Sequence, residues 1–414
     1  MTLAGLLLGP PARAAAWQAH WRQHWPATRV ALLLAATETA AVPGISAAGA
    51  TPDSRRATAA ADAELLLLGP EGERPHALPP LPAGVTPALI SHVVLRSLGL
   101  TPWVVDLGCA VAPAIPHLRL PPPAGAGSAR CLSTGAAMAP ARALALLEQG
   151  RRWGRRLADR PRSAPLLLAE CVPGGTTTAL GVLCGLGVEA TGLVSGSLRL
   201  PAHDLKQALV DQGLGALRER LGEAGARDPL MVAAALGDPM QPLAAGLLLE
   251  ATRGGAPVML AGGSQMAAVL ALALALARPE ERPRLNQATA LATTRWVAGE
   301  PGSDLPSLLG RIGERWRVDP VAFHAALAFH GAGHPALARY EEGYVKEGVG
   351  AGGLALLWEL SGGAPAELAQ RCSLACHRLH AAPGMETQPR QRTGERPETE
   401  ENPGTEERLA SSDG

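Results

Sequence analysis

Short apolar runs alternate with helical patterns through most of the chain. The apolar runs predict buried strands at Arg29 to Ala35, Leu65 to Leu68, Trp103 to Asp106, Pro165 to Leu168, Pro257 to Leu260 and Ala288 to Leu291. The intervening segments, several opened by Pro, Thr or Asp, predict helices at Pro87 to Leu98, Pro140 to Leu157, Thr177 to Leu186, Asp204 to Leu221, Pro242 to Thr252 and Gln265 to Ala277. This alternation favours an α/β fold with a mostly parallel sheet covered on both faces.

The two ends of the chain depart from this alternation. Trp17, Trp21 and Trp25 recur every four residues, which predicts a short helix with one aromatic face. Its opposite face lacks a Lys/Arg cluster, so docking on its own domain or on a second subunit is favoured over a membrane surface. The last segment is poor in apolar residues and predicts a disordered tail. We therefore expect an N-terminal helical extension (1–28), an α/β domain (29–360), a C-terminal helix (361–382) and a disordered tail (383–414).

Composition and charge narrow the function classes. Lys and Arg number 37 and so do Asp and Glu, giving a formal net charge of zero. A protein that grips nucleic acid or anionic lipid carries a strong positive field, so neither partner is expected and any anion site must be local. Lys206 and Lys346 are the only lysines. The six scattered cysteines fit reduced thiols better than a disulfide framework.

One long uncharged segment raises the question of a membrane span. Residues 254–277 carry no charge, but Gly262, Gly263, Ser264 and Gln265 interrupt them. A buried strand, a turn and a helix explain the segment better. The first ten residues have no basic region and do not indicate a signal peptide. A soluble, cytoplasmic protein is expected.

A glycine-rich turn follows the strand that ends near Leu168. Gly174 and Gly175 allow the backbone to approach a ligand closely, the following helix start supplies N–H groups, and Thr176 and Thr177 add hydroxyls. Together they predict a phosphate cradle, although a glycine turn with a Thr helix cap fits the turn equally well. Glu170 favours the cradle, because a carboxylate that leaves an apolar strand more often contacts a substrate or cation than packs in a core.

Two more loops resemble this turn. Ser195 and Gly196 precede a helix that carries Lys206, which is predicted to direct a point charge at phosphate, while a solvated helix lysine is the commoner fate of that residue type. Gly262 and Gly263 repeat the arrangement of strand, glycine pair and helix. The pattern alone does not decide whether this pair binds a ligand or permits close packing of helix on sheet.

The last candidate segment combines Glu347 with a run of glycines. Gly348, Gly350 and Gly353 match the dinucleotide-binding spacing, but a charged stretch precedes them where a buried strand is required. A dehydrogenase would need that strand before Gly348. A carboxylate held directly before a flexible glycine run is instead typical of a positioned general base.

The sequence supports metal binding less well than it supports a phosphate cradle or a general base. His20 with His24, and His330 with His334, are spaced four residues apart, and neither pair has an obvious third ligand. The residues Cys372, Cys376 and His380 line one helix face, where a buried stripe is favoured over a metal site. No metal site is predicted.

The motifs around the candidate loops resemble a known family. They are Glu170 to Thr178, Lys346 to Gly353, Thr37 to Ala40, Pro43 to Pro52 and Ala290 to Val297. From about residue 29 to residue 360 the chain resembles the nicotinate-nucleotide:dimethylbenzimidazole phosphoribosyltransferase family of cobalamin biosynthesis, in its divergent UPF0284-like branch. The resemblance implies a three-layer α/β/α fold with a mostly parallel sheet, a smaller domain built from the chain ends, and a homodimer.

The resemblance also implies a reaction. Phosphoribosyl would pass from nicotinate mononucleotide to a ring nitrogen of a base such as 5,6-dimethylbenzimidazole, with inversion at the anomeric carbon, giving an α-ribazole-type 5′-phosphate and nicotinate. Glu347 corresponds to the family's catalytic glutamate, Gly174 to Thr177 to its phosphate-binding turn, and Lys206 to its loop lysine. No cofactor is implied. The better-known branch has an acidic, Asn-bearing first turn, which Cys171 to Gly175 replace here. A catalytically silent nucleotide-binding regulator of the same fold is the alternative.

Overall fold

An eight-stranded sheet organises the computed structural model, which describes residues 5–78, 84–158, 164–331 and 333–382. The strands are β1 (Leu6–Leu8), β2 (Arg29–Leu34), β3 (Trp103–Asp106), β4 (Leu118–Arg119), β5 (Leu166–Cys171), β6 (Val258–Ala261), β7 (Thr289–Thr293) and β8 (Ala322–His324). Their order across the sheet is β1-β8-β7-β6-β5-β2-β3-β4. Only β1 is antiparallel to its neighbour, so the predicted mostly parallel sheet is confirmed. The predicted tail, 383–414, lies outside the described residues.

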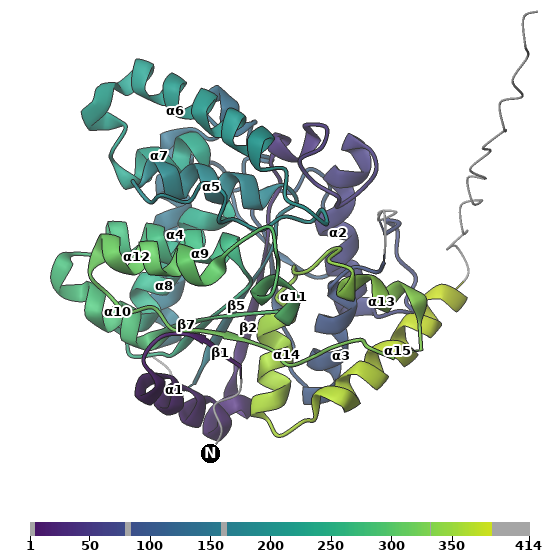
Figure 1. The fold of residues 1–414 in the computed structure, drawn as a ribbon. Helices are drawn as coiled ribbons and strands as arrows, with labels where there is room; N and C mark the ends of the chain where they lie inside the picture. Colours follow the sequence, from purple (N-terminus) through teal and green to yellow (C-terminus); the bar gives the residue numbers. More distant parts are fainter. Residues whose placement is uncertain (1–4, 79–83, 159–163, 332, 383–414) are drawn as a thin grey trace, which may run out of the picture. The chain divides into compact units, whose positions relative to one another are not determined.

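Helices cover both faces of the sheet, which completes the predicted three layers (Figure 1). The apolar cluster on one face takes in α4 (Pro140–Ala158), α5 (Gly175–Gly185), α6 (His203–Gly225), α7 (Pro229–Leu236), α8 (Met240–Arg253), α9 (Ser264–Leu276), α10 (Arg282–Ala288) and α12 (Leu305–Trp316). The cluster on the other face takes in α1 (Pro11–His24), α2 (Pro52–Leu68), α3 (Ala88–Leu98), α13 (Pro335–Glu341), α14 (Ala351–Leu360) and α15 (Pro365–Ala381). Residues of β2 alternate between the clusters, Ala31 and Leu33 in one, Leu32 and Leu34 in the other. This explains why the strand reads as a continuous apolar run.

The chain ends pack on this same sheet. β1 pairs with β8 and forms one edge of the sheet. In α1, Trp17 and Trp21 are buried, and Trp17 stacks on Phe323 of β8 at a centroid distance of 5.1 Å. At the other end, α15 lies against α3 and α14. The described residues up to Ala382 form one compact unit.

One predicted strand is wrong. Leu65 to Leu68 form the last turn of α2, a helix that begins at a capping box in which Thr51 and Ser54 hydrogen-bond each other's backbone. The Ala-rich sequence before these leucines has high helix propensity, so the helix continues through them. The other predicted strands and all of the predicted helices are present. Three-residue strands such as β1 and β8 are too short for a periodic signal, and none was predicted there.

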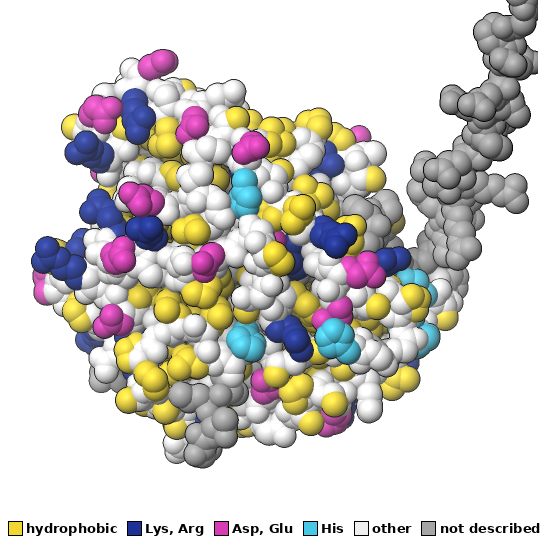
Figure 2. All heavy atoms as spheres, in the orientation of Figure 1, with side chains coloured by type: hydrophobic (Ala, Val, Ile, Leu, Met, Phe, Trp, Pro, Cys, Tyr) yellow, Lys and Arg dark blue, Asp and Glu magenta, His cyan; other side chains and the backbone are white. Residues whose placement is uncertain are grey.

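The surface agrees with the balanced charge of the sequence. On the face shown in Figure 2, basic and acidic side chains are intermingled. In the described part of the chain, no helix combines the length and apolar character that crossing a membrane requires. The uncharged segment 254–277 contains β6, the Gly262–Gly263 turn and α9, as predicted.

Close packing of α14 on the sheet gives a test of the fold. A Cβ atom on Gly353 would lie 2.3 Å from the Cβ of Ala261 in β6, whereas one on Gly215 of α6 meets nothing within 4 Å. We expect Gly353→Ala to lower the free energy of unfolding by about 1–3 kcal/mol through overpacking. Gly215→Ala should raise it by about 0.4–1 kcal/mol, because it restricts the unfolded chain without a clash. Urea denaturation of both variants measures the difference, and equal effects would contradict this packing.

Candidate active site

The candidate site lies where the strand order reverses. From β2 the sheet continues through β3 and β4 in one direction, and from β5 through β6, β7 and β8 in the other. β2 and β5 are paired in parallel, so they form the switch point. Loops leave such a point toward opposite faces and open a crevice beyond the carboxyl ends of the strands. Glu170, near the end of β5, therefore borders this crevice.

The turn after β5 leads directly into α5. Gly174 has a φ of 78°, in the left-handed region, and a Cβ there would lie 2.9 Å from the backbone of Ala40. Gly175 begins α5, and a Cβ there would collide with the Gln265 side chain. Gly174 therefore requires glycine, because of its φ and because its close neighbour is backbone, whereas a side chain at 175 would displace Gln265. The start of α5, with its N–H groups and positive partial charge, faces the crevice together with Thr176.

The loop that carries Glu347 is strained and heavily hydrogen-bonded. Val345 and Val349 have φ values of 46° and 54°, which are unfavourable for β-branched residues. One carboxylate oxygen of Glu347 accepts from Thr293 Oγ1 at 3.0 Å and from the Thr294 N–H at 2.9 Å. The other accepts from the N–H groups of Gly348 and Gly352, both at 3.1 Å. Four donors thus hold the carboxylate in place.

This loop is joined to the end of β5 by the backbone. The N–H of Val349 donates to the carbonyl oxygen of Glu170 at 2.9 Å. Gly350 allows the approach, since a Cβ there would lie 2.6 Å from the Cβ of Ala169. The two segments, far apart in sequence, consequently line one cavity. The predicted residues that line it are Glu170, Gly174, Gly175, Thr176, Ser195, Gly196, Gly263, Glu347 and Gly348.

Four predicted residues lie outside this lining. Gly350 packs closely on Ala169 of β5, and Gly262, with a φ of 154°, lies against the side chain of Met266. The buried hydroxyl of Thr177 has no hydrogen-bond partner among the described residues. Lys206 is fully buried, and its Nζ donates to Thr176 Oγ1 at 3.0 Å and to the Ser195 carbonyl at 2.6 Å. It lies directly behind Gly196, where a Cβ would be 3.2 Å from Nζ.

The second lysine lines the cavity. Lys346 Nζ lies 3.0 Å from a carboxylate oxygen of Glu300 and donates to the carbonyls of Leu198 at 2.6 Å and Gly343 at 2.9 Å. Burial lowers the pKa of Lys346, and the negative charge of Glu300 opposes that shift. Burial also lowers the pKa of Lys206 to about 8, again against the effect of Glu300. The charge of one buried carboxylate, Glu300, therefore favours the protonated form of both lysines.

The two glutamates at the site influence each other. Burial, reinforced by the negative charge of Glu347, raises the pKa of Glu170 to about 8. Burial also raises the pKa of Glu347, but its four hydrogen bonds oppose the shift. Hydrogen bonds from N–H and O–H groups favour the ionised form, so Glu347 is the better stabilised carboxylate of the two. Glu170, with a pKa of about 8, is mainly the neutral acid near pH 7.

Sequence reasoning missed several cavity residues from α2 and from the loops before α2 and α3. Asp62 of α2 is buried in the wall, with burial raising its pKa to about 6, and one of its oxygens accepts from the Cys171 thiol at 3.6 Å. Thr58 and Thr86 line the same part of the cavity. The available signal was an acidic residue within the Ala-rich run of α2. The glycine run after Glu347 follows an irregular segment, so the strand that a dinucleotide site requires before Gly348 is missing.

Comparison with known proteins places the chain in a family. A family model described as phosphoribosyltransferase matches residues 88–280. A UPF0284 protein of Prochlorococcus marinus (strain MIT 9313) is 50% identical over 370 residues, covering 88% of this chain and 89% of the relative. This chain belongs to the UPF0284 family. A UPF0284 protein of Parasynechococcus marenigrum (strain WH8102) is also 50% identical, over 373 residues, 88% of this chain and 91% of that relative.

Solved structures support the fold of this UPF0284 chain. CobT from Thermus thermophilus superposes with a TM-score of 0.52 at 20% identity, covering 87% of this chain and 91% of the other. A nicotinate-nucleotide-dimethylbenzimidazole phosphoribosyltransferase from the same organism gives a TM-score of 0.50 at 20% identity, covering 87% of this chain and 92% of the other. The α/β architecture is thus shared at low sequence identity.

The raised pKa of Glu170 predicts a pH dependence of stability. Its folded-state pKa of about 8 exceeds the ordinary value of 4.5, so the folded state binds the proton more tightly. The contribution of protonated Glu170 to the free energy of unfolding is therefore complete below about pH 4.5 and is lost as the pH rises to about 8. We expect Glu170→Gln to gain stability relative to the unsubstituted protein on going from about pH 5 to about pH 8.5. Urea midpoints at both pH values, with the exposed Glu342→Gln as control, measure this, and parallel pH profiles would contradict it.

Proposed function

We propose that this protein transfers phosphoribosyl from nicotinate mononucleotide to a ring nitrogen of a base such as 5,6-dimethylbenzimidazole. The products are an α-ribazole-type 5′-phosphate and nicotinate, as in cobalamin biosynthesis. One observation carries the proposal. A helix start suited to an anion and the Glu347 carboxyl group, which accepts four hydrogen bonds, line the same cavity. The bond from the Val349 N–H to the Glu170 carbonyl joins the Glu347 loop to the strand that leads to this helix start.

The chemistry requires few groups. A lone pair on a ring nitrogen of the base attacks the anomeric carbon, and the bond from that carbon to the pyridinium nitrogen breaks. Its electron pair neutralises the pyridinium, so nicotinate leaves without a general acid. The attacking base then carries an excess proton, which Glu347 accepts. The remaining task of the site is to hold the phosphate and orient the two rings.

The hydrogen bonds of Glu347 determine how it can take that proton. A carboxylate has about four lone-pair positions, and four donors occupy them. Three of those donors are backbone N–H groups. The fourth is the Thr293 hydroxyl, whose hydrogen can rotate away and let its oxygen accept a hydrogen bond from the protonated carboxyl. Thr293 would thus permit protonation without movement of the loop.

Glu170 complements this base. As a neutral acid near pH 7 it adds no second negative charge beside Glu347. Its Oε2 accepts from the N–H of Val172 at 3.1 Å, and its carboxyl group also hydrogen-bonds the Gln265 side chain, which lines the same cavity. We propose that a bound nucleotide takes the Glu170 proton as a hydrogen bond. A ribose hydroxyl or ring atom of the nucleotide is a suitable acceptor. We therefore propose substrate binding for Glu170 and proton transfer for Glu347.

Replacing the base should remove turnover and leave nucleotide binding intact. We expect Glu347→Gln to lower kcat by about 10²- to 10⁴-fold, because the amide cannot accept the proton. Nicotinate release from nicotinate mononucleotide with a panel of bases measures turnover, and calorimetry measures nucleotide affinity. Glu342→Gln, an exposed carboxylate on the same segment, is the matched control.

The same experiment separates the alternative function. A silent nucleotide-binding regulator would bind nicotinate mononucleotide equally in the unsubstituted protein and in Glu347→Gln, and would release no nicotinate with any base. Absence of nucleotide binding in the unsubstituted protein would remove both functions.

Substitutions of two adjacent threonines, Thr176 and Thr177, test whether the turn before α5 binds phosphate. Thr176 lines the cavity beside the start of α5, whereas Thr177 does not line it and its hydroxyl has no described partner. We expect Thr176→Val to weaken binding of nicotinate mononucleotide about tenfold, the loss of one hydrogen bond to a charged group. Thr177→Val should bind normally. With nicotinate riboside, which lacks the phosphate, both variants should match the unsubstituted protein. Equal losses for the two ligands would argue against a phosphate contact at Thr176.

A further inference from the structure

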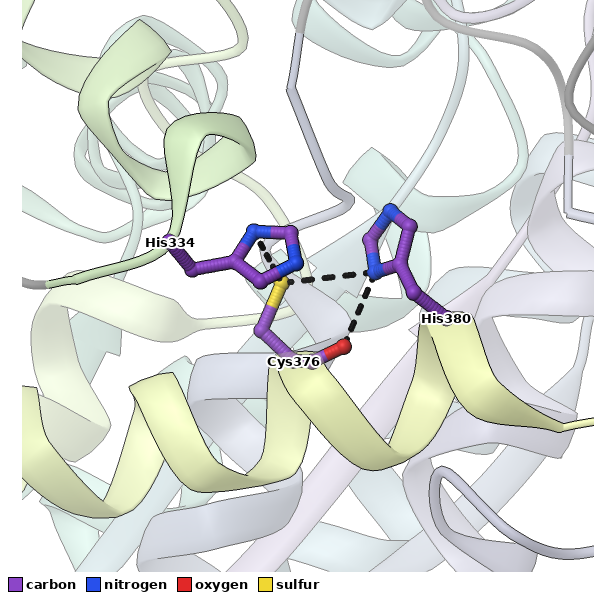
Figure 3. A group of neighbouring side chains, drawn as sticks. All are labelled: His334, Cys376 and His380. Carbon is purple, nitrogen blue, oxygen red and sulfur yellow. Dashed lines mark hydrogen bonds between the residues drawn. The ribbon is translucent and has the colours of Figure 1, made fainter.

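The C-terminal helix carries a second group of reactive side chains, remote in the chain from those that line the cavity. Cys376 and His380 lie one turn apart on α15, and His334, the residue before α13, reaches them from another part of the chain (Figure 3). Cys376 Sγ lies 3.3 Å from His334 Nδ1 and 3.7 Å from His380 Nδ1. One ligand atom from each residue falls within 4.8 Å of the others. The sequence alone offered no third ligand for His334.

These separations suit a tetrahedral metal ion. With metal–sulfur and metal–nitrogen bonds of about 2.3 and 2.0 Å, a sulfur and a nitrogen ligand on adjacent tetrahedral vertices lie about 3.5 Å apart. The two observed distances lie on either side of this value. A thiolate with two imidazoles is a donor set preferred by zinc and related borderline-soft cations and disfavoured by magnesium or calcium.

Ligation through the two Nδ1 atoms would exchange a hydrogen bond of each ring for a metal bond. His380 Nδ1 lies 2.8 Å from the carbonyl oxygen of Cys376, and His334 Nδ1 accepts from the Ala336 N–H at 3.2 Å. With Nδ1 on the metal, the proton of each neutral imidazole lies on Nε2, where it can be donated to water or to an oxygen atom. Cys376 is buried, His334 is partly buried and His380 is exposed, which gives a cation a path from solvent.

A neighbouring cysteine does not belong to the group. Cys372 lies one turn earlier on the same helix, and it is fully buried in the apolar cluster. The helix stripe predicted from the sequence therefore divides into two parts. Cys372 packs in the core, while Cys376 and His380 meet His334.

We propose that His334, Cys376 and His380 bind one zinc-class divalent cation, with water at the fourth tetrahedral position. Binding forms a metal–thiolate bond and releases the Cys376 thiol proton to solvent. The ion would fasten α15 to the start of α13, the helix that precedes Lys346 and Glu347. This inference does not rest on the proposed transferase function.

Metal content and cobalt spectroscopy test the site. The full chain, purified without a histidine tag, is stripped with chelator and titrated with Zn²⁺, and separately with Co²⁺. We expect one equivalent to bind, with Co²⁺ producing a thiolate charge-transfer band and the visible bands of tetrahedral geometry. Cys376→Ala should abolish the charge-transfer band, and His380→Ala should weaken affinity by at least about tenfold. Cys372→Ala, the matched control, should retain both.

The outcomes are distinct. Absence of stoichiometric binding, or equal affinity in His380→Ala and the unsubstituted protein, would overturn the proposal. A charge-transfer band lost in Cys372→Ala but kept in Cys376→Ala would also overturn it. If Cys376→Ala does not fold, His380→Ala still decides, because its side chain is exposed and its loss leaves the core intact.

Discussion

The hydrogen bond from the Val349 N–H to the Glu170 carbonyl is the contact on which the site depends. It ties the Glu347 loop to the central strand at the point where the sheet opens. The loop accepts two valines in left-handed conformations to reach this position, at a cost of order 1–3 kcal/mol each. The four hydrogen bonds to Glu347, together with the bond from Ser91 Oγ to the Val349 carbonyl at 2.9 Å, offset that strain. The same hydrogen bonds that hold the loop therefore also fix the position of the Glu347 carboxylate.

The parallel sheet explains why the remaining groups converge there. β5, β6 and β7 run in the same direction, so the turns that follow them emerge at one edge. Those turns contribute Gly174, Gly263 and the Thr293–Thr294 pair. Ser264 Oγ accepts from the Ser195 N–H at 2.9 Å, which links the β6 turn to the loop before α6. The cavity wall is therefore a set of strand ends connected by hydrogen bonds between their loops, some through the backbone alone and some through side-chain hydroxyls.

Local patterns in the sequence were sufficient to predict the strand ends and the glycine turns that follow them. An apolar run followed by glycines and a helix start is a short-range signal, so Glu170 and Gly174 could be placed at a crevice without coordinates. Contacts between distant segments could not be obtained in this way. The pairing of β1 with β8, the Lys346–Glu300 ion pair and the approach of His334 to Cys376 all join segments distant in sequence. Nothing in the local composition of either partner identifies the other.

The two lysines show why residue type matters at this site in a chain whose other basic residues are arginines. An ammonium group is compact and carries three donors, so it can be fully buried among a few oxygen atoms, whereas a guanidinium needs a planar, five-donor environment. Lys346 uses its donors on Glu300 and two carbonyls, so it holds the loop. Lys206 is held by two oxygen atoms of described residues and sits behind Gly196, which has no side chain to cover it. Its charge therefore lies close behind the cavity wall at Gly196, and within hydrogen-bond distance of Thr176 at the start of α5, where an anion is favoured.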